Sequence, residues 1–494
     1  MNIAGDLTIS KTDTAILRGE VVANNIQGAG ANQGTVKFYN STELTGATAV
    51  TAAIGNVALD TVVLGGKNIT FNHAAGTFNT KTLAFDGKLN ELTATFSKLG
   101  ANALQNTTIT TNSKIRGHNI VLNDADHTLD KAVGSAANNF GNFKLLTDKT
   151  VTVNHADFYA GVISKTNQEG TVNFNANNGN VVQLGDATNE LKAVTFNQNI
   201  TAHGGVYSKT ITVVANKTAK FKEVVRSSGA MTINTGSYIL FDGANARSAA
   251  VIAANAAGDG TVEYNNTVAI SAAVGAAGAQ VNAINFTGTA ATQIASVGAN
   301  LTANNIAIGA QTFKPTADIK LNGTTAINGS TLDFNSANLT LENSATSIMT
   351  GNVTVNTTFA ENALGHLTVD GANTKLNAAA TSLTINIADN DALPVADESF
   401  ALFDTANGGA VNNVTAATIN STNNFIKWTQ NSTHLVRSNN AVEAITAALG
   451  NTNKELLADA VKYGNANNTG DARAHTTDMS KMTKSQLVES MQRL

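Results

Sequence analysis

Three stretches of this chain are nearly the same: Gln33–Asn40 reads QGTVKFYN, Glu169–Ala176 reads EGTVNFNA, and Asp259–Asn266 reads DGTVEYNN. In each stretch a glycine precedes Thr-Val-x-aromatic, so that apolar and polar residues alternate. Glycine supplies the freedom in φ that a corner needs, and a period of two places the valine and the aromatic residue on one face of a strand. Each stretch therefore predicts a turn followed by a strand.

The second and third stretches belong to an internal repeat. Their glycines, Gly170 and Gly260, are 90 residues apart, and the strand-like segments LKAVTF and VNAINF, which end at Phe196 and Phe286, keep the same step of 90 residues. The interval from Gly34 to Gly170 is 136 residues and breaks the period. The repeat has therefore drifted through insertion or deletion.

Strand signals recur about every 8–12 residues along the chain, which is typical of an all-β protein. Sandwiches and barrels share that density, but they do not extend over some 440 residues without long loops, and they seldom repeat themselves internally. A right-handed parallel β-helix, with about 20 residues per coil, explains both observations. Its corners are made by Gly and Asn, which tolerate left-handed backbone conformations. The repeated stretch then marks one corner and one strand of a coil.

The composition excludes several classes of protein. Charged residues make up 13% of the chain against a usual value of about 25%, and the formal net charge is −4. Because no basic excess is available to neutralise phosphates, we expect no nucleic-acid partner. The chain has no cysteine, so disulfides, thiolate metal sites and cysteine nucleophiles are excluded together, and export from the cell is favoured. Only two prolines suit a structure made of hydrogen-bonded strands.

The beginning of the chain, MNIAGDLTIS, has neither the basic region nor the apolar region of a signal peptide. The strand pattern starts at once, and no run of 18 apolar residues follows anywhere. We therefore expect no signal peptide and no transmembrane helix, and we expect the chain to be a segment cut from a longer protein.

The sequence pattern changes twice near the C-terminus, and these changes predict three domains. They are a β-helix body at 1–385, a β cap at 386–437 and a short helical tail at 438–494. The cap region carries an acidic cluster and the only tryptophan, Trp428, and an irregular aromatic element suits the open end of a solenoid. In the tail, Thr452 and Glu455 have the spacing of a helix capping box.

Motifs that carry chemistry are mostly absent. The segment LGGKNIT around Lys67 lacks the Ser or Thr and the spaced glycine of a phosphate loop. Two acidic stretches, which contain Asp124, Asp126 and Asp130 and then Asp389 and Asp391, lack the central glycine of a calcium loop and are expected to be solvated loops. We expect solvated surface positions for the eight scattered histidines: His73, His118, His127, His155, His203, His366, His434 and His475. We therefore predict no metal site and no cofactor.

Two further groups of residues could belong to a functional site, but each also has a purely structural explanation. Three Asp-Gly pairs, at Asp86, Asp242 and Asp370, could supply the paired carboxylates of a glycan-cleaving β-helix enzyme. They are 156 and 128 residues apart, whereas such carboxylates must lie within about 5–10 Å, so turns are favoured. The basic residues between 209 and 226 could contact an acidic glycan or a membrane surface, but a solvated face of the solenoid is favoured. They are Lys209, Lys217, Lys220, Lys222 and Arg226.

The repeated GTVxF stretch, the strands rich in Asn, Thr and Ala, and the absence of cysteine resemble the passenger domains of bacterial autotransporters. The similarity is strongest to rickettsial surface cell antigens of the outer membrane protein A and B type. The region from DESFALFD through FIKWTQNSTHLV resembles the C-terminal cap, or autochaperone segment, of such passengers. The tail resembles the linker toward a translocator barrel, which this chain does not contain.

This resemblance implies a surface adhesin or antigen, exported by type V secretion, that attaches to a host receptor or glycan and thereby serves virulence. It implies a location at the bacterial cell surface or outer membrane, with release into the medium as an alternative. It also implies a translocator barrel as a partner and no enzymatic activity. The alternatives are a β-helix polysaccharide hydrolase or lyase, and a structural surface-layer protein that self-associates. The sequence assigns no catalytic residues and leaves the binding residues unknown.

Overall fold

The computed structural model describes residues 2–440, except for 40–47, 66–67, 72–77, 87–91, 97–99, 113–116, 123–124, 245, 345, 380–381, 390, 392–393, 395 and 424. The chain forms two compact units, Met1–Val262 and Glu263–Leu494, which we call unit 1 and unit 2. The described residues form strands and turns and contain no helix. Consequently no helix in this part of the chain could cross a membrane. The predicted helical tail lies almost wholly outside the described residues.

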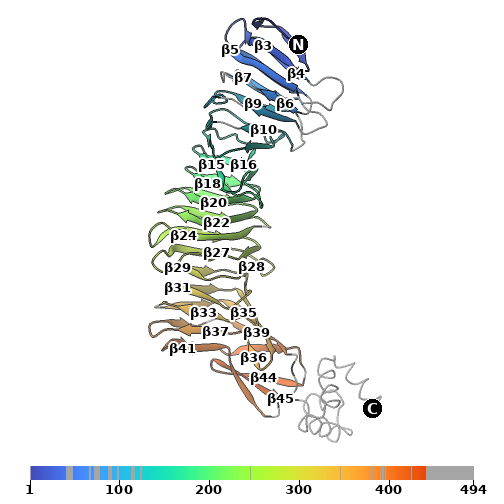
Figure 1. Cartoon of the computed structure of the whole chain (residues 1–494). Coiled ribbons are helices and arrows are strands. Elements are labelled where there is room, and N and C mark those ends of the chain that lie inside the picture. The colour runs from blue at the N-terminus through green and yellow to red at the C-terminus, as the bar shows by residue number, and fades with distance from the viewer. Residues whose placement is uncertain are drawn as a thin grey trace, which may run out of the picture. The chain divides into compact units, whose positions relative to one another are not determined.

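Unit 1 is a parallel β-solenoid in which strands of successive coils pair in columns (Figure 1). One column joins β1 (Leu7–Ile9), β3 (Val21–Gly28) and β5 (Thr48–Gly65). A second joins β2 (Thr14–Arg18), β4 (Thr35–Tyr39), β5, β7 (Phe78–Phe85) and β9 (Thr108–Thr111). A third joins β6 (Asn68–Phe71), β8 (Thr93–Phe96), β10 (Asn119–Leu122), β12 (Asn142–Leu145), β14 (Gly161–Ser164) and β17 (Gln183–Leu184).

Two more columns complete unit 1. One joins β11 (His127–Leu129), β13 (Thr150–Val153), β15 (Glu169–Phe174), β18 (Leu191–Phe196), β20 (Val206–Val213), β22 (Val224–Ile233) and β24 (Arg247–Ala254). The other joins β16 (Asn178–Val181), β19 (Ile200–Ala202), β21 (Thr218–Phe221) and β23 (Tyr238–Phe241). The predicted parallel solenoid is confirmed, whereas the right-handed sense of its coil stays a prediction.

Unit 2 has the same architecture of parallel strands paired in columns (Figure 1). One joins β26 (Val268–Ile270), β28 (Ile294–Val297), β30 (Thr312–Pro315), β32 (Thr331–Asn335), β35 (Asn352–Ala360), β39 (Ser382–Asp389) and β43 (Ala417–Ser421). A second joins β27 (Val281–Phe286), β29 (Leu301–Ile308), β31 (Ile319–Asn328), β33 (Leu339–Glu342), β37 (Leu367–Asp370) and β41 (Phe403–Ala406). A third joins β31, β34 (Ser347–Thr350), β38 (Lys375–Asn377) and β42 (Ala410–Asn412).

Unit 2 also contains antiparallel pairs of strands. Strand β36 (Ala363–Leu364) pairs back on β35, and β45 (His434–Asn439) lies between β40 (Glu398–Ala401) and β44 (Ile426–Asn431) in a three-stranded antiparallel sheet. We call this three-stranded sheet the antiparallel sheet. It falls in the region predicted to be a cap, but that role and the predicted boundaries at 385 and 437 stay predictions.

The repeated stretch forms the corner and strand that the sequence predicts. Gly34, Gly170 and Gly260 all have positive φ, between 63° and 78°. A Cβ atom at Gly34 would lie 2.7 Å from Ile9 Cγ2, and one at Gly170 would lie 2.6 Å from Leu145 Cδ1. Glycine is therefore required for two reasons. The backbone has a positive φ, and an apolar side chain of the preceding coil occupies the space that a Cβ atom would need.

Alternation along the strands builds the core of each unit. In β15 the side chains of Val172 and Phe174 are fully buried, while Asn173 between them faces outward. Rings stack from coil to coil, and in unit 1 neighbouring ring centroids of Phe143, Phe158, Phe174, Phe196, Phe221 and Phe241 are 5.6–6.1 Å apart. Segments β18 and β27, one repeat step apart, share the same burial pattern, as the internal repeat predicts.

Six of the eight histidines lie among the described residues, and the expectation of solvated positions is wrong for two of these six; His73 and His475 lie outside the described residues. His118 is fully buried, and His127 is 1% exposed. His127 opens β11 at the position where the next coil has Val151, so it points into the core column. Burial lowers the pKa of His127 to about 4, although the neighbouring Asp126 acts to raise it. The imidazole is therefore neutral at physiological pH.

Candidate binding groove

None of the sequence-predicted carboxylates meets a second one in a catalytic pair within the described residues. Asp86 accepts hydrogen bonds from the Tyr39 hydroxyl, at 3.1 Å, and from the Asn112 amide. Asp370 accepts one from Asn407 Nδ2 at 2.7 Å. Each therefore ties its own coil to a neighbouring one, as expected of a residue at a turn.

Asp242 is held by two lysines of the basic concentration, Lys220 and Lys222. Burial acts to raise the pKa of Asp242, but the hydrogen bonds and charges of both lysines outweigh it and hold that pKa below its ordinary value. Arg226 Nε lies 3.5 Å from Glu190 Oε1. Two carboxylates, Asp242 and Glu190, therefore compensate part of the charge of the five basic residues within unit 1.

The acidic stretches considered for calcium bind protein groups instead. Asp126 accepts a hydrogen bond from the backbone N–H of Thr150, and Asp130 accepts from Gln105 and Asn154. Among the described residues no cluster of three His, Asp or Glu side chains has the arrangement of a metal site. Asp124 and Lys67 lie outside the described residues.

Asp389 corrects the expectation of a solvated loop. It is fully buried, and its carboxylate binds Arg437 through two hydrogen bonds of 2.8 and 3.1 Å. Trp428 Nε1 donates to the same carboxylate at 3.1 Å, and Arg437 also donates to Glu398 at 3.0 Å. An aspartate at the end of β39 can be buried here because a bidentate arginine from β45 compensates its charge.

Several outward-facing amides in unit 1 are paired in a ladder along the stack. Asn154 donates to Asp130 at 2.7 Å, Asn175 to Asn154 at 3.0 Å and Asn197 to Asn175 at 2.8 Å. These partners are 24, 21 and 22 residues apart in sequence, which agrees with the predicted coil of about 20 residues. A paired amide of this kind holds coils in register and has less capacity left for a ligand.

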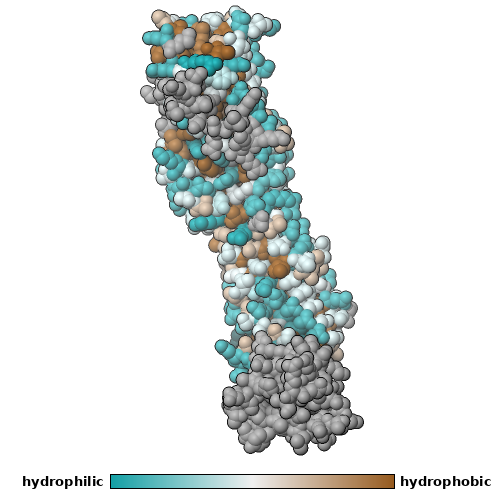
Figure 2. Space-filling model, turned by 90° about the vertical axis from the view of Figure 1, so that its right-hand side faces the viewer, coloured by the Kyte–Doolittle hydropathy of each residue, from teal (hydrophilic) through white to brown (hydrophobic). Residues whose placement is uncertain are grey.

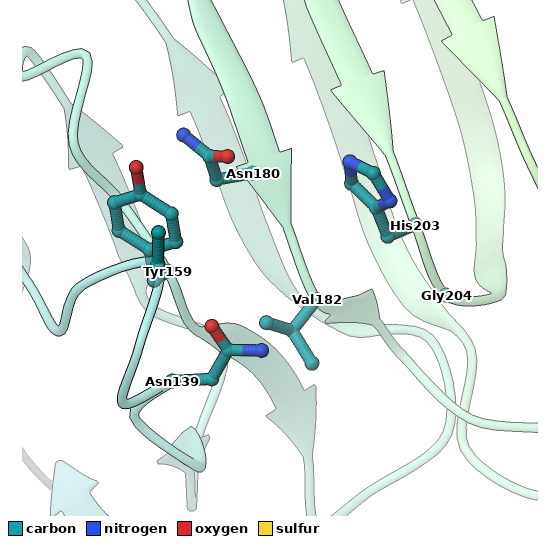
Figure 3. A pocket seen from close by; sticks show the side chains of 7 residues that line it. Asn139, Tyr159, Asn180, Val182, His203 and Gly204 are labelled. Carbon is teal, nitrogen blue, oxygen red and sulfur yellow. The ribbon is translucent and has the colours of Figure 1, made fainter.

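One groove in unit 1 is lined by polar side chains that are not paired in this way. It encloses about 250 Å³ and is lined by Ala136, Asn139, Tyr159, Asn180, Val182, His203 and Gly204 (Figure 3). Within the described residues, the Tyr159 hydroxyl and the Asn139 and Asn180 carboxamides make no hydrogen bond to the protein. We call this feature the unit 1 groove.

The unit 1 groove forms at corners of successive coils. Tyr159 precedes β14, Asn180 lies in β16, and His203 directly follows β19. Backbone hydrogen bonds align these corners, because Phe140 N–H donates to the Tyr159 carbonyl and His203 N–H donates to the Val181 carbonyl, both at 2.8 Å. The stacking of coils, and not a local motif, brings the lining residues together.

Two features fix the shape and chemistry of the unit 1 groove. A Cβ atom at Gly204 would collide with the Val182 carbonyl oxygen, so only glycine allows the backbones to approach this closely. His203 Nε2 lies 2.9 Å from the Gly179 carbonyl oxygen. Because a carbonyl oxygen only accepts, Nε2 carries the hydrogen, and Nδ1 of the neutral ring is an acceptor.

Sequence reasoning missed the unit 1 groove. It treated His203 as a solvated histidine, which is correct for its exposure, and it did not consider Tyr159, Asn139 or Asn180. The sequence contained one further indication of corners in this region. Gly185 and Gly275 are separated by the repeat length of 90 residues, and both have positive φ in the structure. That match locates corners but gives no information about which side chains converge there.

The surface outside the groove is polar with scattered apolar residues. On the face seen in Figure 2, hydrophobic residues form small groups among hydrophilic and intermediate ones. The large hydrophobic side chains that are exposed within the described residues include Ile16, Val251, Ile294 and Ile348. Scattered apolar residues of this kind are normal on a protein surface and need no partner.

Comparisons with known proteins identify relatives at low identity. The chain is 27% identical to outer membrane protein B of Rickettsia typhi (strain ATCC VR-144 / Wilmington) over 467 residues, which cover 85% of this chain and 27% of the relative. It is 26% identical to outer membrane protein B of Rickettsia rickettsii over 502 aligned positions, which cover 91% of this chain and 29% of the relative. The chain thus spans less than a third of the length of these relatives.

No family model matches the chain, and no solved structure matches it. Both relatives are named as outer membrane proteins, which agrees with the predicted location at the cell surface or outer membrane. The β-solenoid also has the architecture predicted for a passenger domain. Over most of its length the chain is therefore a distant homologue of rickettsial outer membrane protein B, the type of autotransporter surface antigen that its sequence resembles.

Proposed function

We propose that the chain is the adhesive part of a surface antigen and attaches the bacterium to host cells through protein or glycan contacts. The observation that carries this proposal is the homology over most of the chain to outer membrane proteins of Rickettsia. The repeated coils of each unit add a surface with hydroxyl and amide groups, on which several weak contacts can act together.

We further propose that attachment involves no chemical conversion of the ligand. Asp86, Asp242 and Asp370 were the carboxylates considered for glycan cleavage. Asp86 and Asp370 accept hydrogen bonds from neighbouring coils, and Asp242 is held by two lysines. A glycoside hydrolase needs two carboxyl groups about 5–10 Å apart on opposite sides of the scissile bond. Binding without turnover therefore agrees best with how these residues are used.

Binding of the purified chain to cultured mammalian cells tests both statements. The labelled chain is titrated onto cells with and without prior glycosidase treatment, and the medium is assayed for released sugar. We expect saturable binding that unlabelled chain competes away, with no release of sugar. Binding that never saturates would overturn the attachment proposal, whereas released sugar would overturn the statement that the ligand is not converted.

The surface-layer alternative makes a different prediction for the chain without cells. A protein that assembles laterally would form polymers as its concentration rises, and sedimentation velocity would show them. An adhesin that acts through its own coils gives a constant sedimentation coefficient over the same range. Polymer formation together with absent cell binding would favour the surface-layer role.

A further inference from the structure

We propose that the unit 1 groove binds the terminal residue of an uncharged saccharide. This inference rests on the proposed attachment function and adds to it a site and a class of ligand. The proposal depends on a difference between two groups of asparagines in unit 1. The side-chain amides of Asn154, Asn175 and Asn197 are hydrogen-bonded to one another or to Asp130 in a ladder. The carboxamides of Asn139 and Asn180 face the groove without such partners in the described protein.

The hydrogen-bonding groups of the groove match the hydroxyls of a sugar. Each sugar hydroxyl both donates and accepts, and so does each carboxamide and the Tyr159 hydroxyl. His203 Nδ1 adds an acceptor in the neutral ring, because Nε2–H is already directed to the Gly179 carbonyl. None of these groups is buried, so each can bind water in the free protein, and a sugar hydroxyl that replaces this water keeps their hydrogen bonds.

The ring of Tyr159 supplies the apolar part of the site. An aromatic face packs on the C–H groups of a pyranose ring while the hydroxyl remains available for a hydrogen bond. Tyr159 is half-buried, so its ring is held by the coil and still accessible to a ligand (Figure 3). The Val182 side chain extends the apolar wall beside it.

The charge and size of the groove define the ligand further. None of the residues that line it is an Asp, Glu, Lys or Arg, so an anionic sugar would lose hydration without gaining a counter-charge. The enclosed volume of about 250 Å³ is below the range of about 300–1,000 Å³ typical of pockets for drug-sized ligands. The groove therefore suits a small part of a glycan, and a terminal residue can enter it without the rest of the chain having to fit.

The site is pre-formed, which favours binding of a small ligand. Gly204 lies against the Val182 carbonyl, and backbone hydrogen bonds between coils fix the corners that carry Tyr159 and His203. A ligand that enters such a site does not need to order the backbone, so little of its interaction energy is lost.

An array of immobilised oligosaccharides tests the proposal directly. The probes end in galactose, glucose, mannose or N-acetylglucosamine, and a second set ends in uronic or sialic acid. Saturation-transfer NMR with the free oligosaccharides then gives affinities for the 494-residue chain and its variants. We expect at least one neutral probe to bind and the anionic probes to bind more weakly.

Variants of the groove locate the binding. Tyr159→Ala and Asn180→Ala are each expected to weaken binding of the neutral probe by about tenfold, and Tyr159→Phe by less. The matched controls are Tyr207→Phe and Asn173→Ala, which change a tyrosine and an asparagine of unit 1 that do not line the groove. The controls should bind like the parent chain, and circular dichroism confirms that every variant is folded.

The failure of this proposal is distinguishable from the failure of the attachment proposal. If no neutral probe binds, if anionic probes bind best, or if Tyr159→Ala and Asn180→Ala bind like the parent, the groove proposal is overturned. Saturable attachment to cells under those conditions would leave the proposed function intact. If the parent chain binds neither cells nor probes, both proposals are wrong.

Discussion

At the scale of single residues, the stability of the solenoid depends on which side chains lie in its core columns. His127 stands where the following coils place Val151, Val172 and Val194. Within the described residues neither ring nitrogen of His127 has a hydrogen-bond partner. A buried imidazole without partners destabilises the fold in its neutral form and much more in its charged form.

The stability of unit 1 is therefore predicted to fall on acidification. In the unfolded chain His127 takes up a proton near pH 6.5, whereas in the folded chain its pKa is about 4. The unfolded state thus binds more protons between these values, and stability is lost as the pH falls from about 6.5 to about 4. The full loss is about 3 kcal/mol.

The substitution His127→Val removes this contribution and continues the valine column. Urea unfolding followed by circular dichroism should show a larger stabilisation relative to the parent at pH 4.5 than at pH 7.5. His155→Gln, at a more exposed histidine of the same unit, serves as the control and should show no such difference. Equal stabilisation by His127→Val at both pH values would contradict the prediction.

At the scale of elements, the antiparallel sheet is attached to the solenoid of unit 2 by a buried polar cluster. Arg437 of β45 and Asp389 of β39 are 1% and 0% exposed. The Arg437 guanidinium carbon lies 4.5 Å from the centroid of the Phe359 ring, and the Phe359 and Trp428 rings are in edge contact at 5.5 Å. Hydrogen bonds, a cation–π contact and ring packing therefore coincide at one junction.

Removing one charge from this junction should cost more than removing both. Arg437→Met leaves the Asp389 carboxylate buried without its cation, at an expected cost of about 3–5 kcal/mol. In the double variant Asp389→Asn, Arg437→Met the remaining Asn can keep the hydrogen bond from Trp428, so part of the stability should return. Trp428 is the only tryptophan of the chain, so its fluorescence reports unfolding at this junction.

Lys320→Met provides the control for these variants. Lys320 pairs with Glu342 on the surface of unit 2 at 2.5 Å, with more than half of its side chain exposed. Loss of an exposed ion pair should leave the urea midpoint of Trp428 fluorescence nearly unchanged. A double variant that is less stable than Arg437→Met would show that the buried ion pair is not the dominant interaction at the junction.

At the scale of the whole molecule, the architecture was predictable because one pattern is repeated many times. Gly34, Gly170 and Gly260 all form corners with positive φ, and the strands after them alternate inward and outward as a period of two requires. Parallel pairing followed because no other all-β fold explained so long and self-similar a chain. Wrong strand assignments within a single coil would not have changed the prediction of a parallel solenoid.

The candidate site could not be predicted in the same way. Asn139, Tyr159, Asn180 and His203 come together through the register between coils, and that register depends on how many residues each corner contains. Sequence patterns gave only approximate positions for the corners. They could therefore not predict which side chains of different coils lie next to one another. His127 is a different case, because alternation with Leu129 indicated an inward position and only the general polarity of histidine argued against it.

The region 386–437 allows a prediction about folding of the whole chain. Parallel pairing between successive coils forms slowly, because contacts distant in sequence must be closed first. We propose that this region provides a stable end from which coils are added. Deleting 386–437 is expected to lower both the yield and the rate of refolding from urea, measured by soluble fraction and circular dichroism.

A deletion at the other end of the chain is the control for this experiment. Removing residues 1–39 takes away coils of unit 1 without affecting the region 386–437, so it should reduce refolding less. Unchanged yield and rate after deletion of 386–437 would contradict a role of this region in folding. Equal losses after both deletions would show that any exposed end has the same effect.

The register between coils also bears on how such a protein diverges. Ladder partners are separated by 24, 21 and 22 residues, so corners of different length are accommodated while the inward side chains stay aligned. Insertions, deletions and substitutions can accumulate at the corners, provided that each strand still delivers apolar residues to its column. Two lineages can then share only about a quarter of their residues across most of this chain, as the 26–27% identity to the rickettsial proteins illustrates. Outward positions and corners are accordingly free to change, while the inward columns keep the fold.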